Sequence, residues 1–283
     1  AARADIENVS RALCDALGGT HQVETFTVGA DPLADLARLM RTPPDLVVNL
    51  CESIGGDARG EAVVPTLLDM AGVPYTGNSG LSLTLALHKP KAKELLRSHG
   101  VPTPAWVVVR DFAECELALA QLGFPLIVKP SREDASAGIH KGSVVRDRAS
   151  LRERIQEIVE TFHQPALVER YIAGREIYVP LLGLPVRALP LSEIDFSGLP
   201  EHLPPIVTYA GKWDTESVEC QCTPSVGCQL SADEAERVTR VAFAAFAALE
   251  GRDYGRVDLR LGEDGVPYVI DINPNCDLSP SAG

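Results

Sequence analysis

GRVDLRLGEDGVPYVIDINPN, residues 255–275, is the segment that says most about the fold. Apolar and polar residues alternate in its two halves, and the EDG segment at 263–265 is typical of a tight turn. The pattern therefore predicts a β-hairpin with one apolar face. The residues predicted to form that face are Val257, Leu259, Leu261, Val266, Tyr268, Ile270 and Ile272.

The opposite face of this hairpin carries oxygen-bearing side chains where a sheet would prefer β-branched residues. Asp258 on the first strand is expected opposite or diagonal to Asp271 on the second, within about 8 Å, and Asn273 shares that face. Two carboxylates this close repel each other unless a cation lies between them, and oxygen ligands with a neutral amide suit magnesium. The alternative is a solvated sheet face on which Asp258 pairs with Arg256 or Arg260. This segment alone leaves both interpretations open.

Two lysines upstream of the hairpin are candidates for binding phosphate groups. Lys129 closes the apolar strand FPLIVKP, and a lysine buried there needs an anionic partner. The loop that follows, SREDASAGIHKG at 131–142, has small residues whose backbone N–H groups can approach a phosphate, although it is not a Walker motif. Lys89 opens the helix KPKAKELLRSHG. Taken one at a time, a solvated Lys89 and an ordinary flexible loop are the simpler explanations.

Two glutamates flank a short linker in ALVERYIAGREIYV, residues 166–179. Glu169 ends an apolar strand, and Glu176 follows soon after Gly174. A carboxylate and the linker backbone can recognise a purine edge, a second carboxylate can bind ribose hydroxyls, and Ile172 supplies an apolar wall. The alternative is a surface hairpin rich in ion pairs.

The rest of the chain is predicted to form helices and strands around these motifs. Before residue 89 they alternate, so we expect a parallel α/β layer there. Its predicted helices are 6–17, 32–40 and 61–72, and its predicted strands are 23–28, 44–50 and 73–78. No strand is predicted before residue 6, so we expect the chain to be incomplete at its start. Later helices are predicted at 89–100, 112–123, 150–162 and 232–249. Later strands are predicted at 101–109, 124–130, 143–146, 166–172, 176–183 and 186–194. A polar loop is predicted through Lys212-Trp213.

Composition argues against several classes of function. The 283 residues include 26 Lys and Arg against 39 Asp and Glu, and the net charge of -13 argues against sequence-independent binding to nucleic acid or anionic lipid. No apolar run reaches about 18 residues, so no membrane span is expected. The chain starts without a signal peptide, which predicts a cytoplasmic protein. Seven scattered cysteines predict reduced thiols, and Cys220, Cys222 and Cys228 lack a fourth ligand at zinc-ribbon spacing.

Five segments in one order resemble the ATP-grasp superfamily and, within it, the D-alanine-D-alanine ligase family. They are PYTGNSGLSLTLALHKPKAKELLRSHGVPTP, FPLIVKPSREDASAGI, ALVERYIAGREIYV, TYAGKWD and the hairpin quoted first. The resemblance runs from about residue 45 to the end. It implies an α/β fold of the α+β ATP-grasp type, in which two subdomains clamp the nucleotide. The implied parts are an N-terminal Rossmann-like parallel-sheet domain at 1–88, a central ATP-grasp subdomain at 89–178 and a C-terminal ATP-grasp subdomain with the metal site at 179–283.

The resemblance also implies how ATP is bound. Lys89 and Lys129 would bind its phosphates, and Ser136 with the backbone of 135–138 would cap them as a mobile loop that takes part in catalysis. The adenine and ribose contacts that the resemblance implies are Glu169, Arg170 and Ile172 for the adenine and Glu176 for the ribose.

Metal binding and catalysis are implied for the hairpin and for one lysine outside it. Asp258, Asp271 and Asn273 would hold two Mg2+ ions, with Mn2+ as an alternative, and Asp271 stands where the family usually has a glutamate. Arg256 would face the reacting carbonyl, and Lys212 the γ-phosphate of ATP.

The implied activity is that of an ATP-dependent carboxylate-amine ligase of the D-alanine-D-alanine ligase type, which acts on small amino acid or peptide substrates in cell wall biogenesis. A substrate carboxylate would attack the γ-phosphate to give an acyl phosphate, which an amine then attacks to form a peptide bond. Family membership also makes a homodimer plausible. Two other hypotheses stay open: a ligase that joins other amino acids or small peptides, and an Mg-ATP-binding protein without catalysis.

Both alternatives are motivated by departures on the substrate side. Glu7 is the one candidate for the family's ammonium-binding glutamate, Cys51-Glu52 replaces a histidine, and Trp213 stands where a tyrosine is usual. Ser279 and Ser281 are candidates for contacting an acceptor carboxylate.

Overall fold

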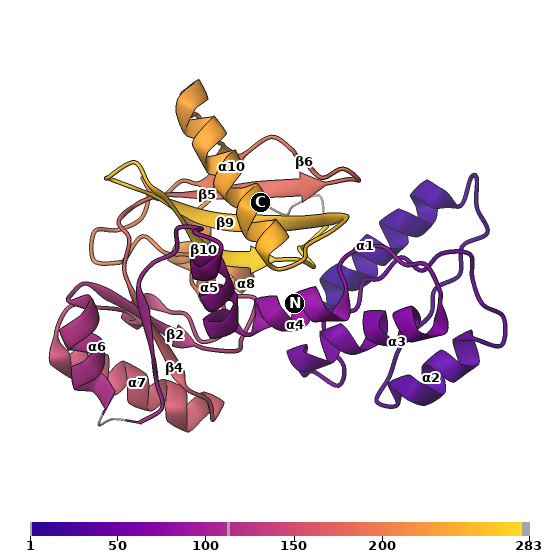
Figure 1. Cartoon of the computed structure of the whole chain (residues 1–283), viewed down its shortest axis with the longest axis horizontal. Coiled ribbons are helices and arrows are strands. Elements are labelled where there is room, and N and C mark those ends of the chain that lie inside the picture. The colour runs from indigo at the N-terminus through magenta and orange to yellow at the C-terminus, as the bar shows by residue number, and fades with distance from the viewer. Residues whose placement is uncertain (1, 112–113, 279–283) are drawn as a thin grey trace.

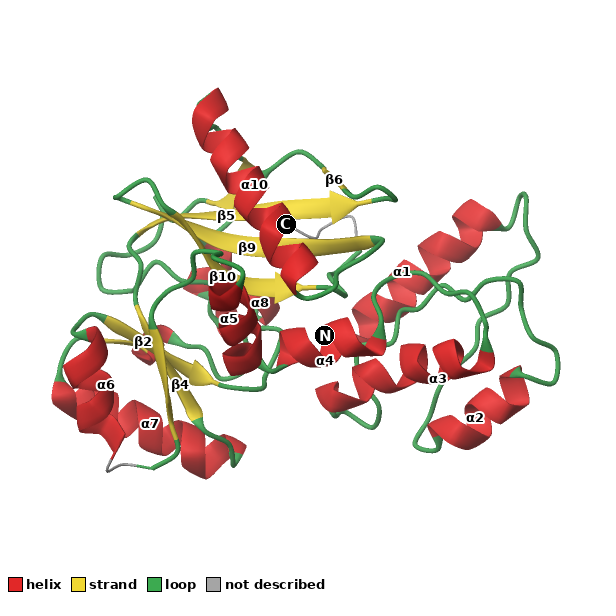
Figure 2. Cartoon of the chain, viewed as in Figure 1, coloured by secondary structure: helices red, strands yellow, loops and turns green. Residues whose placement is uncertain are grey.

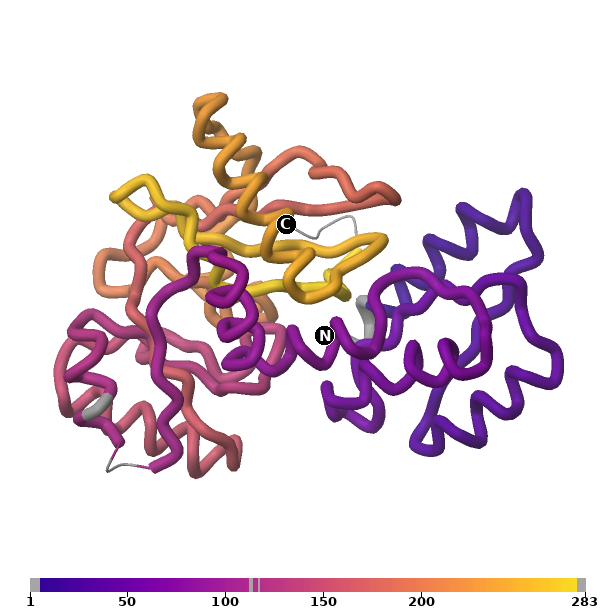
Figure 3. The backbone as a smooth tube through the Cα atoms, viewed as in Figure 1, coloured from indigo at the N-terminus to yellow at the C-terminus, as the bar shows by residue number. Residues whose placement is uncertain are grey.

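The computed structural model describes residues 2–111 and 114–278 of the chain, so Ser279 and Ser281 lie outside the described residues. Figure 1 shows helices α1 to α3 at one end of the molecule and two sheet-containing regions at the other, with α4 between them. The tube in Figure 3 follows the chain from the indigo N-terminal region into the sheets and ends in yellow on the hairpin. No helix within the described residues is long and apolar enough to cross a membrane.

The N-terminal region is helical. It consists of α1 (Ala2–Leu17), α2 (Pro32–Leu39), the 3-10 helix η1 (Ala58–Ala62), α3 (Val63–Ala71) and α4 (Gly80–Leu87). The predicted helices at 6–17, 32–40 and 61–72 are therefore confirmed. A small core of Leu36, Val64, Leu68 and Val73 packs α2 against α3.

The prediction of a parallel sheet in this region is wrong for the described residues. Residues 23–28 form no strand, and 44–50 and 73–78 contribute one parallel bridge between Val47 and Tyr75. Figure 2 shows the yellow strands in the other two regions only. A strand depends on ladder hydrogen bonds to a neighbour, and the alternating residues 23–28 have no such neighbour and lie largely exposed.

The first sheet is antiparallel and has the strand order β1-β4-β2-β3. Its strands are β1 (Trp106–Val109), β2 (Leu126–Pro130), β3 (Val144–Val145) and β4 (Ala166–Arg170). Helices α6 (Cys115–Leu122) and α7 (Arg148–Phe162) pack on it through fully buried residues such as Leu126, Leu151 and Ile155. All four strands and both helices were predicted, and this sheet carries Lys129 at the end of β2.

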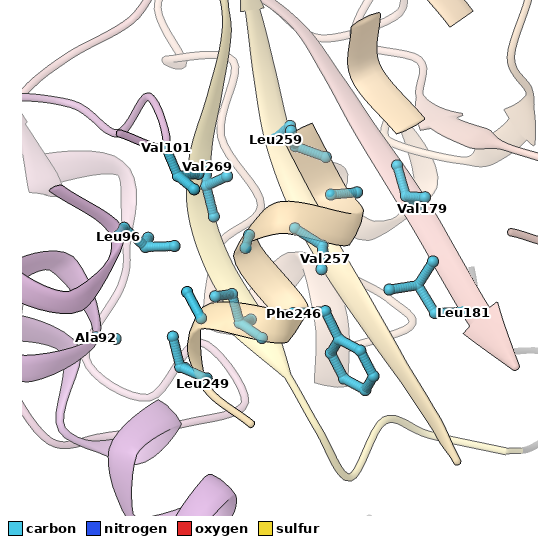
Figure 4. Close-up of a cluster of buried hydrophobic side chains, with 14 of the residues drawn as sticks. Ala92, Leu96, Val101, Val179, Leu181, Phe246, Leu249, Val257, Leu259 and Val269 are labelled. Atoms are coloured by element: carbon cyan, nitrogen blue, oxygen red, sulfur yellow. The ribbon is translucent and has the colours of Figure 1, made fainter. Parts of the chain in front are cut away.

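The second sheet is also antiparallel and has the order β10-β9-β5-β7-β8, with β6 paired to β5. Its strands are β5 (Gly174–Leu182), β6 (Arg187–Ala188), β7 (Ser192–Ile194), β8 (Ser225–Gly227), β9 (Tyr254–Gly262) and β10 (Pro267–Asn273). Helix α10 (Ala232–Ala248) begins in a capping box formed by Ser231 and Glu234 and packs on the sheet. Figure 4 shows Phe246 of α10 and Leu249, the residue after this helix, in one cluster with Val257 of β9. A Cβ at Gly255 would lie 2.5 Å from the Phe246 ring, so only glycine allows this close approach.

The prediction of a polar loop through Lys212-Trp213 is wrong, because these residues end a short helix, α8 (Tyr209–Trp213). Thr208 caps it by accepting a hydrogen bond from the Gly211 N–H. A second short helix, α9 (Val218–Gln221), follows. One-turn helices have no periodicity for a sequence pattern to reveal.

The hairpin of β9 and β10 is confirmed, with Asp258 and Asp271 as direct partners. The apolar face predicted on its return strand is confirmed for Ile272 and wrong for Val266, Tyr268 and Ile270, because the register shifts between Val269 and Asp271. This β-bulge at Ile270 turns Val269 and Ile272 into the core, at 1% and 5% exposure, and leaves Tyr268 and Ile270 half-buried outside it.

The remaining helix of the central segment, α5 (Lys89–Ser98), packs on the second sheet. Ala92 and Leu96 of α5 lie in the same core as Val179 and Leu259 (Figure 4). The expected domain boundary between residues 178 and 179 lies within β5, which pairs with β9 over all of 174–182. The two sheets are joined by residues 171–173, and α5 brings Lys89 toward both of them.

Candidate nucleotide and metal site

Lys89 and Asp271 form an ion pair between the first residue of α5 and the return strand of the hairpin. The Lys89 Nζ lies 2.6 Å from Oδ2 and 2.8 Å from Oδ1 of Asp271. Burial acts to lower the pKa of Lys89, but Asp271, Asp134 and Glu169 together outweigh it and the pKa is raised. Burial likewise acts to raise the pKa of Asp271, and Lys89 and Lys129 hold it below its usual value. Both groups are therefore charged at neutral pH.

A buried triad of Lys93, Glu169 and Lys129 lies beside this pair. The Glu169 carboxylate is 2.7 Å from the Lys93 Nζ and 2.8 Å from the Lys129 Nζ, and Glu169 is 1% exposed. The two lysines overcome the effect of burial and lower the pKa of Glu169. Burial lowers the pKa of Lys93 to about 8, because one shared carboxylate does not fully compensate it. The triad carries one positive charge in excess, which favours an anion nearby.

Lys93 was not predicted from the sequence as a residue of this site. It donates to Thr103 Oγ1 at 2.6 Å and is 3% exposed. A signal was present, because residues four apart lie on the same face of a helix and Lys89 and Lys93 have that spacing. A lysine on the buried face of a helix needs a carboxylate partner, and Glu169 is that partner.

Asp258 is held by the hairpin itself. Its carboxylate accepts from Arg256 Nε at 2.7 Å and Nη2 at 2.9 Å, and from the Asn273 side-chain amide at 3.0 Å. The Arg256 guanidinium stacks over the Tyr178 ring at 4.3 Å, and the Asp258 carboxylate, working against burial, raises its pKa. The ion pair that the sequence suggested as an alternative to a metal is thus formed in this structure.

The donor chemistry of the hairpin nevertheless fits a divalent cation. Asp258 and Asp271 are direct cross-strand partners on one face, with the Asn273 amide beside them. Two carboxylates and an amide oxygen are hard ligands of the kind that Mg2+ prefers. Lys89 and Arg256 now neutralise the two carboxylates, so a metal would take over part of their role. No cluster of three or more His, Cys, Asp and Glu suited to a metal occurs among residues 2–111 and 114–278, and this includes the segment with Cys220, Cys222 and Cys228.

A cavity of about 50 Å³ connects the lysines with the loop predicted to cap phosphates. Lys89, Lys129, Ser136 and Asp271 all line it. Ala135 and Ser136 have φ values of 53° and 60°, and this left-handed backbone is uncommon for residues other than glycine. The Trp213 indole donates to Ala135 O at 3.0 Å, so the loop is tied to α8.

The remaining predicted residues do not line this cavity. Arg170 is exposed and Ile172 half-buried at the end of β4. Glu176 is buried, with Arg260 Nη2 at 2.7 Å and the Tyr178 hydroxyl donating at 3.2 Å. Lys212 is exposed, and its Nζ lies 5.6 Å from the Trp213 ring.

Several known proteins are similar to this chain in sequence. Residues 95–279 match the family described as D-ala D-ala ligase C-terminus. The chain is 39% identical to the uncharacterized protein y4sG of Sinorhizobium fredii, over 87% of this chain and 71% of that protein. It is 30% identical to a D-alanine-D-alanine ligase of Ralstonia pickettii, over 88% of this chain and 70% of the relative.

A solved structure agrees with the sequence relatives. The D-alanine-D-alanine ligase from Bacillus anthracis complexed with ATP superimposes with a TM-score of 0.67 at 25% identity, covering 88% of this chain and 74% of that one. Together with the two antiparallel sheets and the lysine and carboxylate groups between them, these similarities show that the chain belongs to the D-alanine-D-alanine ligase family and has its ATP-grasp fold.

Proposed function

We propose that the protein is an ATP-dependent carboxylate-amine ligase that joins two D-alanine molecules through an acyl phosphate. The observation that carries the proposal is the convergence of Lys89, Lys129, Ser136 and Asp271 on one cavity, because these residues come from segments far apart in the sequence. A relative named D-alanine-D-alanine ligase and a solved relative complexed with ATP support it.

The phosphates of ATP would bind between the two sheets, at Lys89 and Lys129. Both lysines are buried and already hold carboxylates, so phosphate oxygens would exchange with or add to these ion pairs. Ser136 and the left-handed backbone beside it would cap the phosphates. The excess positive charge of the Lys93–Glu169–Lys129 triad would favour this anion over water.

Mg2+ would be held by Asp258, Asp271 and Asn273. We propose two ions, with Mn2+ as an alternative, since the same hard oxygen ligands accept it. When bound, the metal supplies positive charge that neutralises the phosphates and shields the γ-phosphorus from electrostatic repulsion. Asp271 would then share its charge between Lys89 and the metal.

The nucleoside would lie along the end of β4. Arg170 and Ile172 would frame the adenine together with Glu169, and Glu176 would bind the ribose. For Glu169 and Glu176 this requires loosening the ion pairs with Lys93 and Arg260 that the structure contains. Backbone groups of the linker offer the remaining hydrogen bonds to a purine edge.

The chemistry would proceed in two displacements. An oxygen of the first amino acid's carboxylate attacks the γ-phosphorus, the bond to the β–γ bridging oxygen breaks, and ADP leaves. The neutral amine of the second amino acid then attacks the carbonyl carbon, phosphate leaves, and the new amide nitrogen loses a proton. Arg256 would stabilise the oxyanion and Lys212 the γ-phosphate, and closure of 131–142 would exclude water from the acyl phosphate.

The cellular setting follows from the same proposal. A dipeptide of D-alanine would serve cell wall biogenesis, and we propose a cytoplasmic enzyme. We also propose a homodimer. Sedimentation of the purified chain tests the dimer directly.

The deciding experiment measures D-alanine-dependent ADP release and identifies the product by mass spectrometry. We expect ADP, phosphate and the dipeptide in equal amounts. Release of ADP with other amino acids but not with D-alanine would support the ligase of different specificity. Tight binding of Mg-ATP without consumption in the presence of any amino acid would show that catalysis has been lost.

A further inference from the structure

The loop at 131–142, proposed above to cap the phosphates, is held near its C-terminal end by Arg154 of α7. The Arg154 side chain is 2% exposed. Its guanidinium donates through Nη2 to Gly138 O in the loop, and through Nε to Val128 O in β2 at 3.3 Å. Val128 directly precedes Lys129, the proposed phosphate-binding lysine. One buried cation therefore fixes the loop backbone relative to the strand that carries Lys129.

Glu157, three residues further along α7, holds the Arg154 guanidinium in place. Its carboxylate lies 2.7 Å from Arg154 Nη1. Burial acts to raise the pKa of Glu157, but Arg154 and His140 together lower it. Because the Gly142 N–H donates to His140 Nδ1 at 3.0 Å, the neutral ring carries its proton on Nε2 and donates to Glu157 at 3.0 Å. Glu157 thus ties Arg154 to a second residue of the loop.

Gly138 is tightly enclosed where Arg154 binds it. Its φ of 72° lies in the left-handed region, and a Cβ there would lie 2.7 Å from both the Phe162 ring and Pro130 Cγ. The next residue, Ile139, accepts a hydrogen bond from the Tyr209 N–H of α8 at 2.8 Å. The C-terminal end of the loop is therefore fixed by contacts with both α7 and α8.

The N-terminal end of the loop is held by Gln164, two residues after α7. Gln164 Oε1 accepts from the Arg132 N–H at 2.6 Å, and Nε2 donates to Glu133 Oε1 at 2.7 Å. Both ends of the loop are thus held by one short stretch of chain, residues 154–164. Ser136 lies between the two ends and lines the cavity proposed for the phosphates.

We propose that Arg154 and Gln164 are positioning residues that hold the loop over the phosphates of ATP. This inference rests on the proposed function, because it takes ATP to bind in this cavity. A loop fixed at both ends keeps Ser136 and the left-handed backbone beside it at the cavity before the nucleotide binds, so less conformational entropy is lost on binding. Releasing either end enlarges the set of loop conformations and weakens binding of the triphosphate.

The test compares binding of a non-hydrolysable ATP analogue with binding of AMP, which lacks the β- and γ-phosphates. Titration calorimetry with Mg2+ is run on the wild type, Arg154→Met and Gln164→Leu. We expect each variant to lose about tenfold or more in affinity for the ATP analogue and to bind AMP as the wild type does. A general loss of structure would weaken both ligands alike. Arg148→Met is the control, because Arg148 lies on the same helix with a side chain that is 71% exposed, and it should keep both affinities.

Arg154→Lys keeps the charge but loses the fork that reaches Gly138 O and Val128 O together, so it should recover only part of the affinity for the ATP analogue. Gln164 is half-buried, so Gln164→Leu is expected to fold, and it decides alone if Arg154→Met does not. A wild-type preference for the ATP analogue over AMP in the folded variants would overturn the inference, as would an equal loss of affinity for both ligands.

Turnover is scored separately from binding. Absence of amino-acid-dependent ATP consumption by the wild type would defeat the proposed ligase. Calorimetry would still decide whether Arg154 and Gln164 position the loop, because neither the ATP analogue nor AMP has to react.

Discussion

Lys89 and Asp271 are 182 positions apart and form an ion pair of 2.6 Å that joins α5 to the face of the hairpin that carries Asp258 and Asp271. Each group keeps the other charged in a largely buried place. The pair holds Lys89, a proposed phosphate-binding residue, against Asp271, a proposed metal-binding residue, before ATP or a metal ion binds. The site is therefore assembled by the protein's own charges.

Lys89→Met should weaken ATP binding. The variant keeps the length of the side chain but removes the positive charge beside the cavity, so KM for ATP should rise about tenfold or more. Lys91→Met on the same helix is the control, because Lys91 is 58% exposed and pairs with the neighbouring Glu94. Steady-state ADP release measures both. Equal KM values for the two variants would remove Lys89 from the phosphate site.

Glu169→Gln should destabilise the fold strongly. It leaves Lys93 and Lys129 buried without a carboxylate, and breaking a buried ion pair costs about 3 kcal/mol or more in the free energy of unfolding. The loss should be smaller at pH 9 to 10 than at pH 7, because Lys93, whose pKa is about 8, can then lose its proton. Chemical denaturation at both pH values measures this.

The control for Glu169→Gln is Glu116→Gln, which removes a carboxylate from an ion pair with Arg148 in which the two side chains are 67% and 71% exposed. Its effect should stay below about 1 kcal/mol. Similar losses for the two variants would contradict a special role for the buried triad.

Asp271→Asn should lower turnover by about a hundredfold or more, since it removes a metal ligand. Asp271→Glu restores the family's usual residue and should retain turnover, because a longer carboxylate still reaches both Lys89 and the metal. Removing divalent cations with EDTA should abolish ADP release and leave the melting temperature of the nucleotide-free protein unchanged. The reason is that Lys89 and Arg256 already neutralise the two aspartates. A large drop in melting temperature would show that the metal is structural.

Glu61 should make the fold less stable as the pH rises. Its pKa is raised from 4.5 to about 8 in the folded protein, so the folded state binds more protons than the unfolded state between these values. Its contribution to stability is complete below pH 4.5 and is lost progressively up to about pH 8. Glu61→Gln should gain stability relative to the wild type over this window, by a few kcal/mol at most. Denaturation of both proteins at pH 5 and pH 8 tests the difference, and parallel pH profiles would contradict it.

Local sequence patterns were enough to predict the helices and strands whose apolar residues recur with a clear period. Alternation over 255–275 predicted the hairpin and placed Asp258 opposite Asp271, and helical spacing located α2, α3, α5, α7 and α10. The order of five motifs was enough to indicate the family. Such features depend on residues close together in the chain, where side-chain periodicity reports directly on the exposed and buried faces.

The other features were set by tertiary contacts, because they depend on partners distant in the sequence. Residues 23–28 have a strand pattern but no neighbouring strand to complete their hydrogen bonds. The bulge at Ile270 placed Val269 in the core, where the alternation had predicted Tyr268 and Ile270. The sequence could not show the partners of Lys93 and Glu61. The cost of a buried charge depends on the groups that the fold places beside it, and these groups come from distant parts of the chain.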